Sequence, residues 1–421
     1  MVSITGRIRD LILYISVFLL AIVYLPGIPP YAKFTALSVT KPRKLETIPN
    51  LKVGGLDEAE ILFEGKIKGP QSYASHDGKL YTGLENGYVV EIDERQVVPI
   101  AILGENCDPN KPYPQCARPF GMQFHRDGYL YVCDAYNGIF KLDVKTGKYE
   151  RIVDGRDLIE GVPPKQFVAL DIDNEGNIYW AHYSSEFNID NVGCIVSADP
   201  SGRIIRYNAT TKKNEVLVRD ISAHGLSLSK NEDFIMISEM STFRLTKYNI
   251  RGPKAGVYEP FIDGLPGSPD NIYPDGQGGY FVSLVRTHEL SSFFLSHPNI
   301  RRVLARMIYI LQLPVKFILA LYPNDFAEWL LHYIGSLDSI SPLLDRSAVV
   351  LRIDEEGHII EGASNTNGKF FVLSSVCIHN GFLWLGSAIT NFAARIPVEK
   401  VFPNLLLSDS MSSTLDGFGL C

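Results

Sequence analysis

Apolar and polar positions alternate along most of the chain in a unit that recurs six times. Each copy has a turn with Asp or Asn and Gly, an apolar strand, a short gap and a second strand. The copies occupy residues 76–93, 125–143, 174–208, 231–249, 276–357 and 379–396. Equivalent apolar positions are 45 to 57 residues apart, with one longer step of 103.

Units of this length built from short strands are typical of propeller blades, which bury their faces against each other. Two separate globular domains would need a linker, and none divides the copies. The pattern therefore predicts an all-β fold, a six-bladed β-propeller over residues 59–400. Residues 59–66 are expected to supply a closing strand to the last blade.

The long step contains an insertion in blade 5, residues 291–345, too long for a structureless loop. Its stretch 301–322 has helical apolar spacing, with a break expected at Pro314. Two interpretations stay open: a helical cap packed on the propeller, or amphipathic helices lying in the membrane interface. Pro314 and Lys316 disfavour a second bilayer crossing. The charged residues of this stretch are Arg301, Arg302, Arg306 and Lys316.

The amino end predicts a membrane anchor. Residues 11–32 carry no charge and are long enough to cross a bilayer. A cleavable signal peptide would need small residues after the apolar stretch, whereas this stretch runs into prolines. We therefore expect a short cytoplasmic tail (1–10), a single transmembrane signal anchor (11–32) and a stem (33–58). A carboxyl-terminal tail (401–421) follows the propeller.

The orientation of the body has arguments on both sides. More positive charges follow the anchor than precede it, which would place the body in the cytosol, but long domains translocate largely regardless of charge. Cys107 and Cys116 are spaced for a local disulfide, and Asn208 begins a glycosylation sequon. Two free thiols and an unused Asn are the alternative. We favour a single-pass type II protein of the endoplasmic reticulum or plasma membrane, with a lumenal or extracellular body.

Composition narrows the partners. The 421 residues are 46% hydrophobic, and 40 Lys+Arg against 47 Asp+Glu give a formal charge of −7. A chain without a basic surplus is not expected to bind nucleic acid. None of the six cysteines forms a CxxC pair, and Cys133, Cys194 and Cys377 are expected to be buried and unreactive.

Several ordered motifs resemble one family. They are ARPFGM (117–122), YVCDAYNGIFKLD (131–143), GRIIRYN (202–208) and LPGSPDNIYP (265–274). From about residue 60 to 400 the chain resembles the strictosidine synthase-like propellers. The resemblance implies a six-bladed propeller related to calcium-dependent lactonases and aryl esterases. It also implies an active centre at the top of the central channel, where Glu, Asn and Asp hold calcium.

The calcium ligands implied by the resemblance are poorly filled in this chain. The first-blade Glu falls on Gln71, and the fourth-blade Asn falls on His224, whose nitrogen suits calcium poorly. The third-blade Asn falls on the apolar Val168 or Ala169. The fifth-blade pair is kept as Asp270 and Asn271. Gln71, Asp270 and Asn271 would form a weak metal site, so we expect no tightly bound calcium.

The resemblance also leaves the catalytic positions changed. Phe120 stands where the lactonases carry a His, and residues 371–381 lack the last-blade Glu of strictosidine synthases. Condensing an amine with an aldehyde needs a group that exchanges protons, so strictosidine synthase activity is not expected. His224 and Asp270 are the candidate catalytic pair, because a carboxylate can orient an imidazole to activate water. The alternative is an unpaired His224 filling the place of a lost ligand.

Two functions follow from these residues. The first is a membrane-anchored hydrolase of the aryl esterase or lactonase type that acts on a small apolar ester. The second is a non-catalytic propeller that binds a protein, glycan or lipid. Fold alone leaves both open, because propellers host many activities.

Overall fold

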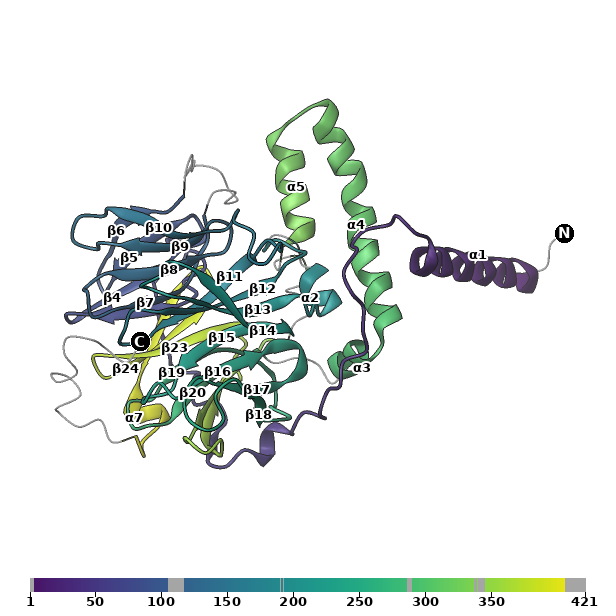
Figure 1. Ribbon diagram of the computed structural model, residues 1–421. Helices are drawn as coiled ribbons and strands as arrows, with labels where there is room; N and C mark the ends of the chain where they lie inside the picture. Colours follow the sequence, from purple (N-terminus) through teal and green to yellow (C-terminus); the bar gives the residue numbers. More distant parts are fainter. Residues whose placement is uncertain are drawn as a thin grey trace.

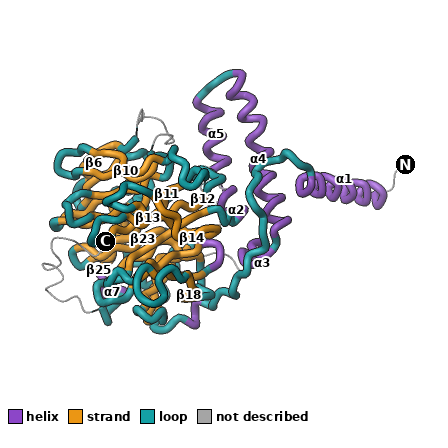
Figure 2. Tube along the Cα trace, in the orientation of Figure 1, coloured by secondary structure: helices purple, strands orange, loops and turns teal. Residues whose placement is uncertain are grey.

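Six β-sheets surround a central axis in the computed structural model (Figures 1 and 2). The structure describes residues 4–104, 117–189, 191, 193–285, 290–336, 339 and 345–405. The innermost strands of the six sheets contact one another in turn and close a ring. The predicted all-β six-bladed propeller is confirmed.

In the first three blades the strands run in sequence order from the axis to the rim. Blade 1 is β3 (Tyr73–His76), β4 (Lys79–Gly83), β5 (Tyr88–Ile92) and β6 (Val97–Ile102). Blade 2 is β7 (Pro119–Phe124), β8 (Leu130–Asp134), β9 (Gly138–Leu142) and β10 (Tyr149–Asp154). Blade 3 is β11 (Lys165–Ile172), β12 (Ile178–Ser184), β13 (Gly202–Tyr207) and β14 (Asn214–Ile221).

The last three blades follow the same plan. Blade 4 is β15 (Ala223–Leu228), β16 (Phe234–Glu239), β17 (Arg244–Asn249) and β18 (Tyr258–Ile262). Blade 5 is β19 (Ser268–Pro274), β20 (Tyr280–Val285), β21 (Ala348–Ile353) and β22 (Ile359–Ser364). Blade 6 is β23 (Leu373–His379), β24 (Phe382–Ser387) and β25 (Ala393–Pro397), and the short helix α7 (Val398–Val401) follows it.

The ring is closed by a strand from the amino-terminal side. β2 (Glu60–Leu62) pairs antiparallel with β25 as the outer strand of blade 6, as the pattern of residues 59–66 predicts. The stem also contributes β1 (Leu51–Lys52), which pairs parallel with β22 of blade 5. The carboxyl end of the stem is therefore part of the propeller.

The core consists of apolar clusters that fill the spaces between neighbouring blades. One cluster joins blades 6 and 1 through the fully or nearly fully buried Tyr73, Leu80 and Trp384. Successive side chains of a strand enter clusters on opposite faces of the blade, as in β8, so the strands of a propeller are buried on both faces.

The described part of the insertion between β20 and β21 contains the helices α3 (Leu290–Ser296), α4 (Pro298–Leu321) and α5 (Asp325–Gly335). Figure 1 shows α4 and α5 as an antiparallel pair beside the propeller. The expected break at Pro314 is wrong, because α4 continues through it to Leu321. Proline removes a single backbone N–H, and one lost hydrogen bond does not end a helix whose other turns remain.

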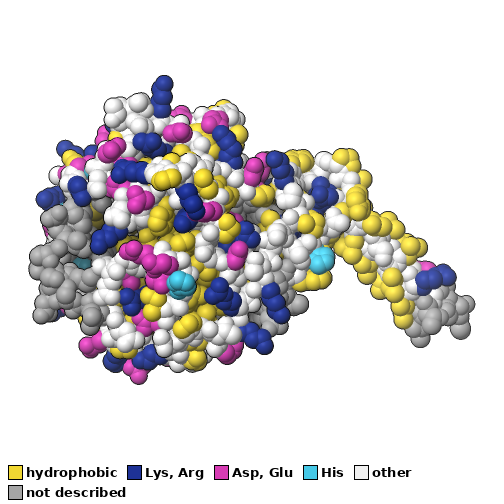
Figure 3. All heavy atoms as spheres, turned by 60° about the horizontal axis from the view of Figure 1, so that its bottom comes forward, with side chains coloured by type: hydrophobic (Ala, Val, Ile, Leu, Met, Phe, Trp, Pro, Cys, Tyr) yellow, Lys and Arg dark blue, Asp and Glu magenta, His cyan; other side chains and the backbone are white. Residues whose placement is uncertain are grey.

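The amino-terminal helix α1 (Ile4–Tyr24) projects away from the propeller (Figure 1). It covers the first part of the expected anchor, and residues 25–32 continue without helix. In Figure 3 most visible side chains of this projecting arm are hydrophobic. Arg306 of α4 donates to the carbonyl oxygens of Ile22 (2.5 Å) and Val23 (3.1 Å), which ties the end of α1 to the insertion.

The cysteines differ in part from expectation. Cys133 is buried and free, as expected. Cys377, expected to be an unreactive buried thiol of β23, is disulfide-bonded instead. A strand position alone does not show which other thiol the fold brings near. Cys107 and Cys116 lie outside the described residues.

Candidate active site at the propeller hub

A cavity of about 320 Å³ opens at the end of the central channel where the inner strands begin. All six blades contribute, each through a residue just before or within the first three positions of its inner strand: Gln71, Phe120, Gln166, His224, Asp270 and Ser374. The ring topology therefore gathers side chains that are far apart in the sequence. Gln71, His224 and Asp270, three of the residues that the sequence singles out, line this one cavity.

β-bulges aim these side chains at the hub. In blades 2 to 6 the register between the first two strands shifts near the start of the inner strand. The positions skipped by the shifts include Phe120, Val168, His224, Asp270 and Ser374. A bulge leaves a residue out of the ladder and re-orients its side chain. In blades 2, 4, 5 and 6 a skipped residue lines the cavity, whereas in blade 3 the skipped residue is Val168 and the lining residue is Gln166.

Buried serines hold one bulge against the next. Ser238 of β16 donates to the carbonyl oxygen of Asp270 (2.5 Å) and accepts from the N–H of Gly225 (2.6 Å). Ser283 of β20 donates to the carbonyl oxygen of Ser374 (2.7 Å), and Ser375 of β23 donates to that of Gln71 (2.5 Å). These bonds join blades 4 to 5, 5 to 6 and 6 to 1.

Gly225 allows the bulge of blade 4 to touch that of blade 5. A Cβ at this position would lie 2.4 Å from the carbonyl oxygen of Asp270 and 2.7 Å from the Cα of Asn271. These distances are well inside van der Waals contact, so only glycine fits without moving the backbone. The close approach fixes the separation between the main chains that carry His224 and Asp270.

His224 and Asp270 lie together, as the sequence analysis requires of a catalytic pair. Nδ1 of His224 is 2.7 Å from Oδ1 of Asp270, and their side chains are 12% and 3% exposed. The two atoms are within ion-pair distance, although their alignment is not that of a hydrogen bond. The ring of Tyr183 packs edge-on against the imidazole at 6.0 Å. Nε2 is thus the imidazole nitrogen left to exchange a proton with a ligand.

Gln71 places an unpaired polar atom in the same cavity. Its residue is 1% exposed, and its buried Oε1 has no hydrogen-bond partner. Asn271 is also buried, but its Nδ2 donates to the carbonyl oxygen of Ser374 (3.0 Å) and lies 3.2 Å from Oδ1 of Asp270. The amide of Asn271 therefore joins blades 5 and 6.

The donor set does not fit a calcium ion. Calcium in proteins takes six to eight oxygen ligands, usually with several carboxylates. Asp270 is the one carboxylate among the described residues that line this cavity, and its Oδ1 already faces His224 and Asn271. Val168 and Ala169 are buried hydrocarbon side chains. The hub is therefore better suited to chemistry carried by the imidazole and carboxylate.

Two kinds of cavity-lining residue were not predicted from the sequence. Gln166, a polar residue within the apolar strand β11, supplies the hub side chain of blade 3, and its Nε2 donates to the carbonyl oxygen of Phe187 (2.9 Å). The insertion covers the mouth with Phe294 and Leu295 of α3 and with Arg301 and Leu304 of α4. Neither position stands out in the sequence, because Gln166 follows Lys165 and Arg301 precedes Arg302.

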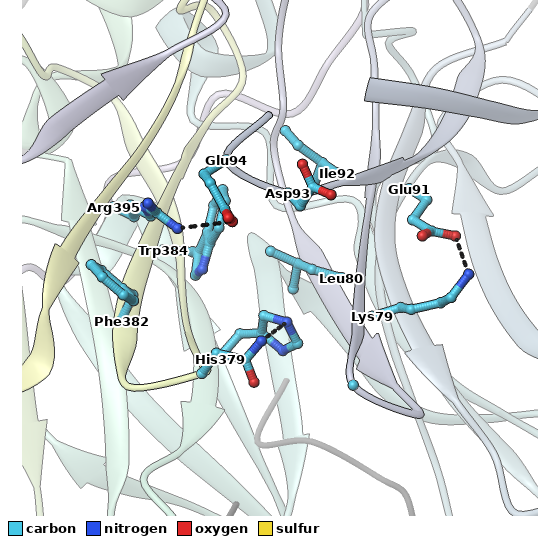
Figure 4. A pocket seen from close by; sticks show the side chains of 12 residues that line it. Lys79, Leu80, Glu91, Ile92, Asp93, Glu94, His379, Phe382, Trp384 and Arg395 are labelled. Carbon is cyan, nitrogen blue, oxygen red and sulfur yellow. Dashed lines mark hydrogen bonds and ion pairs between the residues drawn. The ribbon is translucent and has the colours of Figure 1, made fainter. Parts of the chain in front are cut away.

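A second pocket, of about 400 Å³, lies at the junction of blades 6 and 1 on the opposite face (Figure 4). Its charged side chains already pair with one another or with neighbours: Lys79 with Glu91 (2.8 Å), and Arg395 with Glu60 (2.8 Å) and Glu94 (3.5 Å). The Lys79–Glu91 pair lies within blade 1, whereas Arg395 joins blade 6 to the closing strand β2 and to blade 1. Because these charges already have partners, we assign no ligand to this pocket.

Another buried histidine has a structural role. His182 of β12 is fully buried, its Nδ1 donates to the carbonyl oxygen of Ser184 (3.0 Å), and its Nε2 accepts from Nε of Arg203 (2.7 Å). Acceptance at Nε2 requires the neutral ring with its proton on Nδ1. Burial and then the charge of Arg203 lower the pKa of His182 to about 3.

Fold and cavity together define a six-bladed propeller with a largely apolar hub site. The strictosidine synthase family model matches residues 168–253. The adipocyte plasma membrane-associated protein Hemomucin of Drosophila melanogaster is 34% identical over 406 residues, which cover 93% of this chain and 70% of that protein. Protein strictosidine synthase-like 3 of Arabidopsis thaliana is 32% identical over 359 residues, covering 80% and 85%.

The chain therefore belongs to the strictosidine synthase-like family, as the motifs predict. Among solved structures, a gluconolactonase of Xanthomonas campestris is similar with a TM-score of 0.52 and 13% identity, covering 86% of this chain and 98% of that one. At that identity the likeness shows the fold alone. The adipocyte plasma membrane-associated protein of Mus musculus is 27% identical over 363 residues, covering 84% and 80%.

Proposed function

We propose that this protein is a membrane-anchored hydrolase that opens a small apolar ester or lactone in the hub cavity. The observation that carries the proposal is the 2.7 Å contact between Nδ1 of His224 and Oδ1 of Asp270 in that cavity. The apolar side chains around the pair suit an apolar substrate and exclude water from it.

In this proposal Nε2 of His224 takes a proton from a water molecule, and the water oxygen attacks the carbonyl carbon of the ester. The carboxylate of Asp270 stabilises the imidazolium that forms. The imidazolium then returns the proton to the leaving alkoxide, which gives an acid and an alcohol. The Gln71 amide can turn its N–H groups into the cavity and stabilise the negative oxygen of the intermediate. None of these steps needs a metal ion.

We do not assign strictosidine synthase chemistry. Among the described last-blade residues that line the cavity, Val372, Ser374 and Ala388, the polar one is Ser374, whose hydroxyl does not exchange protons with an amine near neutral pH. The pair His224–Asp270 is better suited to activating water.

The proposal keeps α1 as the single membrane anchor, with α4 in the membrane interface. Among the described helices α4 is the one that is long and apolar enough over its length to cross a bilayer. The helix α1 carries Arg7, Arg9 and Asp10 near its start, and the uncharged stretch proposed as the anchor continues beyond α1 to residue 32. However, Arg301, Ala305 and Gln312 of α4 are buried against the rest of the protein, which supports an interfacial position. Its other face exposes apolar residues, among them Phe317 (65%) and Leu321 (71%).

A type II orientation, with the body in the lumen or outside the cell, is part of the same proposal. The disulfide of Cys377 supports an oxidising compartment. Several relatives are named plasma membrane-associated, which supports the plasma membrane as one location beside the endoplasmic reticulum. Asn208 stands at a partly exposed turn between β13 and β14, where it would accept a glycan.

The test uses the full chain in phosphatidylcholine nanodiscs with phenyl acetate and a γ-lactone as substrates. Asp270→Asn and His224→Gln are each expected to lower kcat/KM about 10²- to 10⁴-fold. His379→Gln, a histidine outside the cavity, is the matched control and should keep full activity. Chelator should not change the rates. Turnover that survives in both hub variants would refute the proposed site.

The second candidate is a non-catalytic propeller that binds a protein, glycan or lipid partner. This candidate is favoured by the neutral or apolar groups at Gln71, Val168 and Phe120. The lactonase relatives carry polar or charged groups at these positions. A folded chain without turnover on a broad panel of esters and lactones would support this candidate over the hydrolase.

A further inference from the structure

Arg301 is a buried cation at the mouth of the hub cavity. Its residue is 1% exposed, and it lines the cavity from the first turn of α4. One terminal nitrogen donates to the carbonyl oxygen of Ser197 and the other to that of Thr35. Its buried Nε has no hydrogen-bond partner among the residues that the structure describes.

No described residue neutralises the charge of Arg301. Among the described residues no carboxylate lies within ion-pair distance of its guanidinium. Two carbonyl oxygens satisfy two of the five N–H donors but supply no negative charge. A buried charge without a counter-ion is energetically costly, so binding of an anion beside Arg301 would be favourable.

The surroundings of Arg301 restrict the anion. Phe294, Leu295 and Leu304 line the cavity beside it, and Phe243 lines it from blade 4. A hydrated inorganic anion would lose its water without replacement along these side chains. A carboxylate attached to an apolar body satisfies both features, because the guanidinium forms paired hydrogen bonds with a carboxylate and the body displaces water.

We propose that the hub cavity binds an apolar monocarboxylate, with the carboxylate on Arg301 and the apolar body against α3, α4 and Phe243. The proposal deepens the proposed hydrolase, because it rests on the same cavity and a carboxylate is what ester hydrolysis releases. Binding itself does not require turnover, so the two ideas can fail separately.

The probe pair is 4-phenylbutyrate and 4-phenylbutanamide, which share shape and differ in charge. Calorimetry with the full chain in phosphatidylcholine nanodiscs measures both dissociation constants. We expect the carboxylate to bind about 10- to 100-fold more tightly than the amide. Arg301→Gln should remove this preference and Arg301→Lys should keep part of it. Arg306→Gln, which alters the same helix outside the cavity, should keep all of it.

Leu304→Trp covers the case in which Arg301→Gln does not fold. Leu304 is 42% exposed and lines the cavity, so a larger side chain there should block both probes while leaving the bonds of Arg301 in place. Equal binding of the two probes to the wild-type chain would overturn the proposal, and so would a carboxylate preference that survives Arg301→Gln. Asp270→Asn separates the two ideas, because it should lose turnover and keep the preference.

Discussion

Ser238→Ala tests how the fold holds the His224–Asp270 pair. Ser238 is fully buried, and its hydroxyl both donates to the carbonyl oxygen of Asp270 and accepts from the N–H of Gly225. Alanine removes both bonds and leaves two buried backbone groups unsatisfied. Each such group costs about 1–3 kcal/mol, so the free energy of unfolding should fall by about 2–5 kcal/mol.

Ser283→Ala is the matched control one blade further on. The Ser283 hydroxyl lies 2.7 Å from the carbonyl oxygen of Ser374 and 3.2 Å from that of Asn271, and donates to the nearer one. The carbonyl oxygen of Ser374 also accepts from Nδ2 of Asn271. That carbonyl keeps a partner after the substitution, so the loss should stay within about 1 kcal/mol.

The assay is urea unfolding of the full chain in nanodiscs, followed by tryptophan fluorescence, with the ester assay run on the same samples. Ser238→Ala should lose both stability and turnover, whereas Ser283→Ala should nearly keep both. A loss below about 0.5 kcal/mol for Ser238→Ala, or equal losses in the two variants, would refute the argument that this hydroxyl holds blade 4 to blade 5.

Three further predictions follow from the described contacts. His182 has a pKa of about 3 in the fold against an ordinary value of 6.5, so unfolding takes up a proton below about pH 6.5. The free energy of unfolding should therefore fall from pH 6.5 towards pH 3, by about 2 kcal/mol at pH 5. In urea titrations His182→Gln should make the free energy of unfolding depend less steeply on pH. An equal pH dependence in the variant and the wild type would contradict this prediction. Leu62 of the closing strand is 7% exposed, so Leu62→Ala should lower the free energy of unfolding by about 2–5 kcal/mol in denaturant titrations. Glu60 of the same strand makes an exposed ion pair with Arg395, so Glu60→Ala should lower it by less than about 1 kcal/mol. Similar losses in the two variants would count against the closure. Calcium at millimolar concentration should leave the midpoint of thermal unfolding unchanged, and a rise of several degrees would show a bound ion that the hub side chains do not explain.

Much of the fold could be predicted because the same strand-and-turn pattern occurs six times in the sequence. Repetition at a fixed period constrains the architecture more strongly than any single strand does. The closing strand at Glu60–Leu62 could also be inferred, since the last blade lacked an outer strand. The helical continuation through Pro314 could not, because local propensity opposes it and the flanking turns decide it.

The candidate site could be predicted only in part. Resemblance located Gln71, His224 and Asp270, and the ring topology then explained why they meet. Gln166 and Arg301 could not be recognised because each lies beside another polar residue, Lys165 or Arg302, and an arginine in an amphipathic helix is normally a surface charge. Burial of Arg301 depends on how the insertion folds back over the hub, which is a long-range property.

The outer strand of blade 6 has a consequence for how the chain is made. Glu60 and Arg395, which pair across that strand, are 335 positions apart, so the segment next to the membrane must wait for nearly the whole polypeptide before its partner leaves the ribosome. Contacts of such high sequence separation form late and slowly. During that wait β2 lacks its pairing strand, so its backbone groups are a target for chaperones at the site of synthesis.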